Sequence, residues 1–66
     1  MREVWKHKPT GFRWVVELDR HRRIVGAAGP FTTDDWDARL LAHLMPSRHS
    51  AYYVQDHAAE FVREEA

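Results

Sequence analysis

Two runs in which apolar and polar residues alternate, 12–18 and 24–28, stand out along the chain. Side chains alternate across a strand, so two such runs close together are typical of a β-hairpin with one buried face. The face expected to be buried carries Phe12, Trp14, Val16 and Leu18. The opposite face carries Arg13, Val15 and Glu17.

The break between the runs, Asp19 to Arg22, fits a type I turn followed by one left-handed residue. This interpretation places Arg22 where glycine is usually preferred. In the resulting register Leu18 faces Ile24, and the further pairs are Glu17–Val25, Val16–Gly26 and Val15–Ala27. A slip of one residue would turn the second strand over.

A third strand is predicted over 2–7, at the edge of the sheet. The turn after it, Lys8-Pro9-Thr10-Gly11, has proline and glycine where a type I turn closed by a glycine bulge places them. In this register Trp5 faces Val15 and His7 faces Arg13, with the further pairs Val4–Val16 and Lys6–Trp14. The three strands then form an antiparallel meander.

A helix is predicted after the dipeptide Gly29-Pro30, which is expected to end the last strand because proline cannot donate to a ladder. Thr32 is a suitable N-cap, and Asp34 and Asp35 fall in the first turn, where the helix dipole favours negative charge. Pro46 is expected to end the helix near Leu44 or Met45. Helical spacing gives it one apolar stripe, expected to pack on the buried sheet face: Trp36, Leu40, Leu41 and Leu44.

The segment after a polar connector, 47–50, is ambiguous. The aromatic and branched residues of 51–54 suit a strand, while Val54, Ala58, Phe61 and Val62 also fit one continuous helix. We favour an extended segment over 51–55 and then a helix capped by Asp56 that runs to about Glu64. The predicted fold class is therefore α+β: a three-stranded antiparallel meander, a central helix packed on one sheet face, and a C-terminal helix.

Length and composition predict one small domain, 1–66, in which only about 60% of the surface of the unfolded chain is buried. The chain has no cysteine, which excludes disulfides and thiolate metal sites. The start of the chain, MREVWKHK, has charges but no apolar core, and no apolar run approaches the roughly 20 residues of a spanning helix. We expect a cytoplasmic protein that does not enter a membrane.

The net charge is zero, but the two halves differ. Residues 1–30 hold seven Lys or Arg against three acids, which gives +4, and residues 31–66 hold three against seven, which gives −4. Such asymmetry indicates a basic face for acidic partners, an acidic face for basic partners, or two halves that attract each other.

The sheet face turned away from the helix is the strongest candidate site. It is expected to be an apolar patch with a polar rim, and such patches mark binding surfaces. The alternatives are that the C-terminal helix covers the patch or that a second copy of the chain does, as in a homodimer. We expect a small non-enzymatic accessory or regulatory protein that binds another protein, or itself, through Trp5, His7, Arg13, Val15 and Val25.

Nucleic-acid binding by the same sheet is the second hypothesis. Aromatic and basic groups interleave on the predicted sheet and in the 20–23 loop, as base stacking and phosphate neutralisation require. The residues that would contact nucleic acid are Arg13, Arg20, Arg22 and Arg23. The neutral total charge, with Glu3 and Glu17 on the same face, argues against it.

Catalytic and metal motifs do not emerge from the sequence. The hydroxyls of Thr10, Thr32, Thr33, Ser47 and Ser50 resemble turn and cap residues rather than activated nucleophiles. Asp34 and Asp35 are explained by the helix dipole, and Asp37 is expected to pair with a basic side chain such as Lys6. His57, Glu60 and Glu64 share one face of the predicted last helix, but without the spacing of zinc ligands. We expect no enzymatic activity, cofactor or metal.

Overall fold

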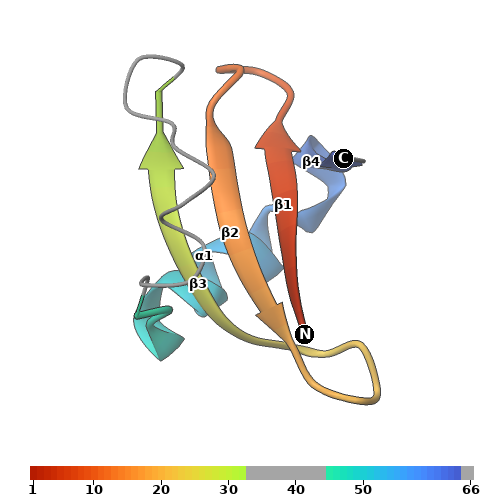
Figure 1. Cartoon of the computed structure of the whole chain (residues 1–66). Helices are drawn as coiled ribbons and strands as arrows, with labels where there is room; N and C mark the ends of the chain where they lie inside the picture. The colour runs from red at the N-terminus through yellow and green to blue at the C-terminus, as the bar shows by residue number, and fades with distance from the viewer. Residues whose placement is uncertain (33–44, 65–66) are drawn as a thin grey trace.

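A four-stranded antiparallel sheet with one α-helix on one of its faces makes up the part of the chain that the structure describes, residues 1–32 and 45–64 of a computed structural model. The strand order is β3-β2-β1-β4 (Figure 1). The elements are β1 (Arg2–His7), β2 (Arg13–Leu18), β3 (Ile24–Phe31), α1 (Arg48–Asp56), the short 3-10 helix η2 (Ala58–Glu60) and β4 (Phe61–Glu64).

The predicted three-stranded meander with two helices is wrong. The C-terminal segment is not a helix: β4 pairs antiparallel with β1, which places β1 inside the sheet rather than at its edge. The predicted order of an extended segment followed by a helix is also reversed, because residues 51–55 belong to α1 and the extended segment, β4, comes after the helix. The helix predicted after Thr32 falls on residues 33–44, outside the described part of the chain.

The β1–β2 hairpin differs from the predicted register by one residue. His7 donates its N–H to the carbonyl of Phe12 at 2.7 Å, so the loop contains four residues, and its last residue, Gly11, has a φ of 77°. Trp5 therefore lies opposite Trp14 instead of Val15. Because successive side chains point to opposite faces, this shift moves Trp5 and His7 to the side of the sheet that carries Trp14.

The β2–β3 hairpin confirms the predicted turn. Arg22 has a φ of 62°, its N–H donates to the carbonyl of Asp19 at 3.0 Å, and Leu18 faces Ile24 as expected. The register then shifts by one residue at a β-bulge, so the predicted pairs beyond Leu18 are wrong. The observed pairs are Glu17–Gly26, Val16–Ala27 and Val15–Ala28.

The predicted end of the third strand at Gly29-Pro30 is also wrong, since β3 continues to Phe31. β3 is an edge strand, and proline is tolerated there because one side of the strand needs no ladder donor. A second irregularity lies here, between the pairs Val15–Ala28 and Arg13–Phe31. A Cβ added to Gly29 would lie 2.7 Å from the ring of Trp14, so only glycine allows this close approach.

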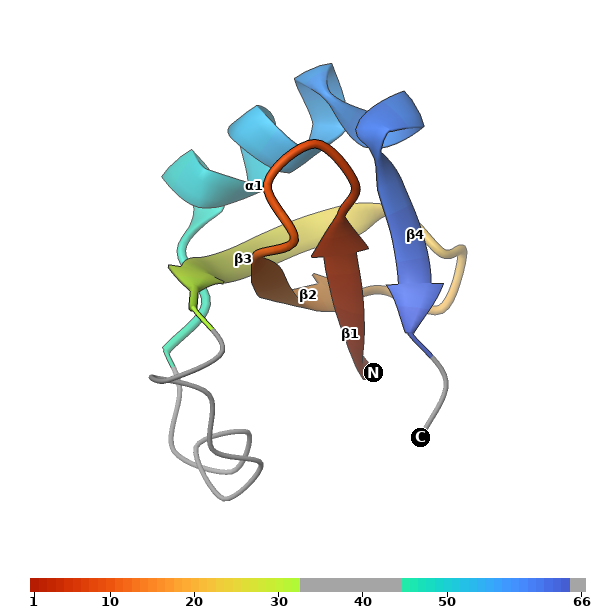
Figure 2. The same cartoon turned by 90° about the horizontal axis from the view of Figure 1, so that it is seen from above.

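Helix α1 begins at a cap that the sequence interpretation assigned to a connector. The Ser47 side chain accepts the N–H of Ser50 at 3.0 Å, which satisfies one of the open donors at the helix start. The backbone of Ser47 also exchanges two hydrogen bonds with Ala27, of 3.0 and 2.9 Å. These bonds hold the start of α1 against β3, and the helix lies on one side of the sheet (Figure 2).

The core lies between α1 and the sheet. Val54 of the helix and Phe61 of β4 pack with the side chains that β2 and β3 send to this face: Trp14, Val16, Leu18 and Ala27. Trp14 stacks on Tyr53, with ring centroids 5.2 Å apart, and meets Phe61 edge to face at 6.1 Å. The prediction that Trp14, Val16 and Leu18 share a buried face is confirmed, while Phe12, the fourth residue predicted there, is only partly buried.

Candidate binding groove

A groove of about 200 Å³ lies between β3 and α1. Its apolar part is contributed by Ile24 and Val25 of the strand and by Ala51 and Tyr52 of the helix. Arg48 and Gln55 of the helix supply its polar groups. Val25 is 44% exposed and Tyr52 is 54% exposed, so two large apolar side chains border the groove and remain open to solvent.

The β-bulge places Val25 in this position. Val25 is the extra residue between the pairs Leu18–Ile24 and Glu17–Gly26, and a bulged strand bends and re-aims its side chains. The spacing of the helix residues supplies the opposite wall, because positions 48, 51, 52 and 55 follow the i, i+3, i+4, i+7 pattern of a single helix face.

Contacts on both sides of the groove fix the helix to the strand. The Gln55 side chain donates from Nε2 to the carbonyl of Ile24 at 2.7 Å, and the Ala27–Ser47 pair holds the other end. These contacts also occupy backbone groups on the outer edge of β3, which protects this edge against the addition of another strand. A ligand in the groove would therefore be recognised by side chains.

Charge in the groove comes from Arg48. Five other arginines in the described part of the chain form ion pairs with carboxylates: Arg2, Arg13, Arg22, Arg23 and Arg63. Arg48 is exposed and forms no ion pair with another residue of 1–32 or 45–64. The groove thus combines an apolar floor with one available cation.

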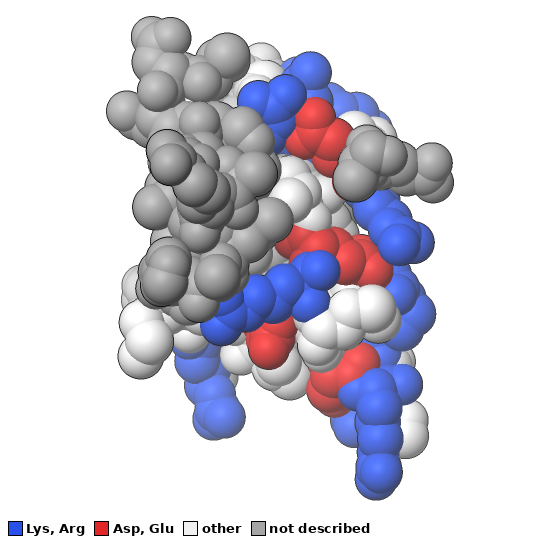
Figure 3. All heavy atoms as spheres, viewed as in Figure 1, with Lys and Arg blue, Asp and Glu red and all other residues white. Residues whose placement is uncertain are grey.

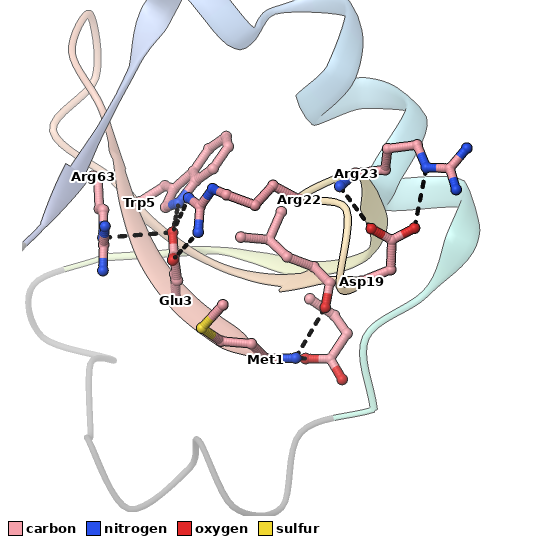
Figure 4. A network of polar contacts seen from close by, with 9 residues as sticks. Met1, Glu3, Trp5, Asp19, Arg22, Arg23 and Arg63 are labelled. Carbon is pink, nitrogen blue, oxygen red and sulfur yellow. Dashed lines mark hydrogen bonds and ion pairs between the residues drawn. The ribbon is translucent and has the colours of Figure 1, made fainter.

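A buried carboxylate on β1, that of Glu3, is the centre of a network of polar contacts that includes the β2–β3 turn (Figure 4). The side chain of Glu3 is 6% exposed and accepts the indole N–H of Trp5 at 3.0 Å and the guanidinium of Arg22 at 3.1 and 3.3 Å. Arg63 of β4 approaches the same carboxylate at 3.6 Å. The hydrogen bond from Arg22 is the main cause that lowers the pKa of Glu3, so the carboxylate stays charged.

The arginines predicted to bind nucleic acid are mostly occupied. Arg13 forms a bidentate pair with Glu64, at 2.7 and 3.0 Å, Arg22 binds Glu3, and Arg23 binds Asp19 at 3.2 Å. Arg20 lies exposed in the turn. On the sheet face turned away from α1, acidic and basic side chains lie next to one another rather than in a basic patch (Figure 3).

The five residues predicted to bind a protein partner do not share one face. Trp5 and His7 lie on the α1 side of the sheet, where both rings contact Phe61, while Arg13 and Val15 lie on the other side. Val15 is fully buried, at 0% exposure, and so cannot form an open patch. Of the five, only Val25 belongs to the groove.

The buried side chain of His7 connects the β1–β2 loop to η2. Its Nε2 lies 2.8 Å from a carboxylate oxygen of Glu60, and its Nδ1 lies 2.8 Å from the hydroxyl of Thr10. Since a carboxylate only accepts, Nε2 donates to Glu60, and in the neutral imidazole Nδ1 accepts the Thr10 hydroxyl. The hydroxyl in turn accepts the N–H of Phe12 at 3.2 Å. This arrangement ties the β1–β2 loop to η2.

Other residues considered from the sequence do not assemble into a site. His57 stacks on Tyr53, Glu60 binds His7, and Glu64 binds Arg13, so these three do not share a helix face. Within the described residues, no group of three or more potential metal ligands occurs. Asp34, Asp35 and Asp37, together with the proposed partner contact of Asp37, fall outside the described part.

Sequence reasoning missed the groove residues of α1. Their i, i+3, i+4, i+7 spacing was present in the sequence, after a serine that could cap a helix. We predicted an extended segment instead of this helix because aromatic and branched residues of the run Ala51-Tyr52-Tyr53-Val54 favour a strand.

In comparisons with known proteins, no family model, curated protein or solved structure matches the chain. Of the helices that the structure describes, none has the length and apolar character to cross a bilayer.

Proposed function

We propose that the protein is a small non-enzymatic binding module that recognises a segment of another protein in the groove between β3 and α1. The observation that supports the proposal best is that two exposed apolar side chains, Val25 and Tyr52, face a groove whose two sides are fixed to each other. A preformed groove binds with little ordering cost, and an exposed tyrosine is a common anchor of protein interfaces.

This proposal changes the site but keeps the class of function expected from the sequence. The sequence placed the partner surface on the sheet face that carries Val15, which is buried. The proposed surface is instead the groove at the sheet edge. Nucleic-acid binding through Arg13 and the 20–23 loop is disfavoured, because releasing those guanidinium groups for phosphates would break ion pairs with Glu64, Glu3 and Asp19.

A selection of random displayed peptides against the whole chain tests the proposal. Peptides that bind the wild type are then measured against Tyr52→Ala and Val25→Ser, which remove the two exposed walls. Val62→Ala is the matched control, since Val62 is equally exposed, at 44%, but lies in β4 away from the groove.

We expect each groove variant to weaken binding about tenfold or more, as the truncation of an interface anchor does, and Val62→Ala to leave it unchanged. Peptides that bind all four proteins equally, or a selection that yields no binder, would overturn the proposed site. Circular dichroism spectra that match those of the wild type show that the variants are folded.

A further inference from the structure

We infer that the groove recognises a peptide in which an aliphatic side chain lies next to a carboxylate, with Arg48 as the residue that binds the carboxylate. This inference rests on the proposed function and adds the chemistry of the partner. It is carried by the placement of Arg48, which forms no ion pair with another described residue, beside the apolar side chains of the groove.

The size of the groove favours a single side chain as its occupant. Its volume of about 200 Å³ is below the range of about 300–1,000 Å³ typical of pockets for drug-sized molecules. The neighbouring side chains are Ile24, Val25, Ala51 and the ring of Tyr52, which offer an aliphatic group dispersion contacts and burial but offer few hydrogen bonds.

The charge of the groove favours an acidic neighbour for that side chain. Among the six described residues that line the groove, Arg48 is the one charged residue and none has a carboxylate. An arginine presents a planar set of donors that matches a carboxylate in bidentate geometry. Arg13 already binds Glu64 in this way on the other face of the sheet.

The backbone of the groove argues against recognition by strand addition. The carbonyl of Ile24 accepts the Gln55 amide, and both backbone groups of Ala27 bond to Ser47. The partner segment therefore gains its specificity from side chains, and its sequence is expected to show the aliphatic and acidic positions clearly.

A charge reversal tests the inference. Random peptides are selected separately against the wild type, Arg48→Glu and the matched control Arg20→Glu, in which another exposed arginine outside the groove is reversed. One library ends in a free carboxylate and a second library ends in a constant Gly-Ser tail, so that a side-chain carboxylate is distinguished from a chain end.

We expect the wild type and Arg20→Glu to select an aliphatic residue beside Asp, Glu or the chain end, and Arg48→Glu to select Lys or Arg at the acidic position. An acidic peptide selected by the wild type should bind Arg48→Glu about tenfold more weakly.

Two results would overturn the inference in different ways. Peptides that depend on Tyr52 but have the same consensus for the wild type and Arg48→Glu would refute the role of Arg48 and leave the groove as the binding site. Peptides that do not depend on Tyr52 at all would refute both the inference and the proposed function.

Discussion

Trp5 of β1 lies directly opposite Trp14 of β2, and this pair decides which side of β1 is buried. The ring of Trp5 packs at 6.3 Å from Phe61, on the side of the sheet that α1 covers. We therefore expect Trp5 to contribute to the stability of the fold.

Trp5→Ala is expected to destabilise the fold by about 2 kcal/mol, less than for a fully buried tryptophan because Trp5 is only half-buried. This is a large share of the few kcal/mol that a small core supplies. Urea unfolding followed by circular dichroism measures the change. The control is Lys6→Ala, the exposed neighbour on the opposite side of β1, which should alter stability by less than about 0.5 kcal/mol. Equal effects of the two substitutions would contradict the register.

Gly29→Ala should reduce the free energy of unfolding more than Gly11→Ala does. The new methyl group at Gly29 would overlap the Trp14 ring, which lies 2.7 Å from its position, and overpacking of this kind costs about 1–3 kcal/mol. At Gly11 the space is open and only the positive φ is unfavourable, which costs about 1 kcal/mol. The midpoints of urea unfolding compare the two variants, and a Gly29→Ala protein as stable as the wild type would show that Trp14 does not pack on this strand.

His7→Ala removes a buried ring that is bonded to both Thr10 and Glu60. We expect the free energy of unfolding to fall by about 1–3 kcal/mol, since two polar partners lose their hydrogen bonds and the contact with Phe61 is also lost. His21→Ala, in the exposed turn, is the control and should have little effect. Hydrogen exchange gives a second readout, because the amide of Lys8, which donates to the carbonyl of Glu60, should exchange faster in His7→Ala. An unchanged exchange rate there would refute the proposed link between the loop and η2.

Acid should destabilise the protein through three carboxylates. The pKa of Glu3 is lowered mainly by its hydrogen bond with Arg22, that of Glu64 by its bond with Arg13, and that of Asp19 by the backbone N–H of Arg23. A lowered pKa in the folded state means that the stabilisation is complete above the unfolded value, 4.5 for a glutamate, and is lost as the pH falls below it through the folded value.

Urea unfolding between pH 7 and pH 2.5 measures this dependence. Glu3→Gln should be less stable than the wild type at pH 7 and should lose less stability on acidification, because one of the three groups no longer titrates. If the wild type and Glu3→Gln lost the same free energy of unfolding between pH 5 and pH 2.5, the lowered pKa of Glu3 would be contradicted.

Local patterns predicted part of this fold because the residues concerned interact with near neighbours. The alternation of Trp14, Val16 and Leu18 indicated the buried face. The turn from Asp19 predicted the left-handed conformation of Arg22, whose N–H bonds to the carbonyl of Asp19. The register of β1 was missed because Lys8–Gly11 also fits a type I turn closed by a glycine bulge, whereas in the structure His7 bonds to Phe12 across all four residues. A shift of one residue moves the side chains of β1 to the other face of the sheet.

The C-terminal strand and the groove could not be derived from the sequence for another reason. β4 has four residues and is stabilised by pairing with β1, more than fifty positions earlier in the chain, so its local pattern does not distinguish strand from helix. The groove depends on the bulge at Val25 and on the docking of α1 by Gln55 and Ser47, which are tertiary features. Only the helix face of Arg48 and Tyr52 could have been found from spacing.

An amide chemical-shift map of the full chain, titrated with a selected peptide, tests the central claim that the groove is the binding site. We expect the largest shifts on Ile24, Val25 and α1, with β4 unaffected. Shifts concentrated on Arg13, Val15 and their neighbours on the opposite sheet face, with none in the groove, would contradict it.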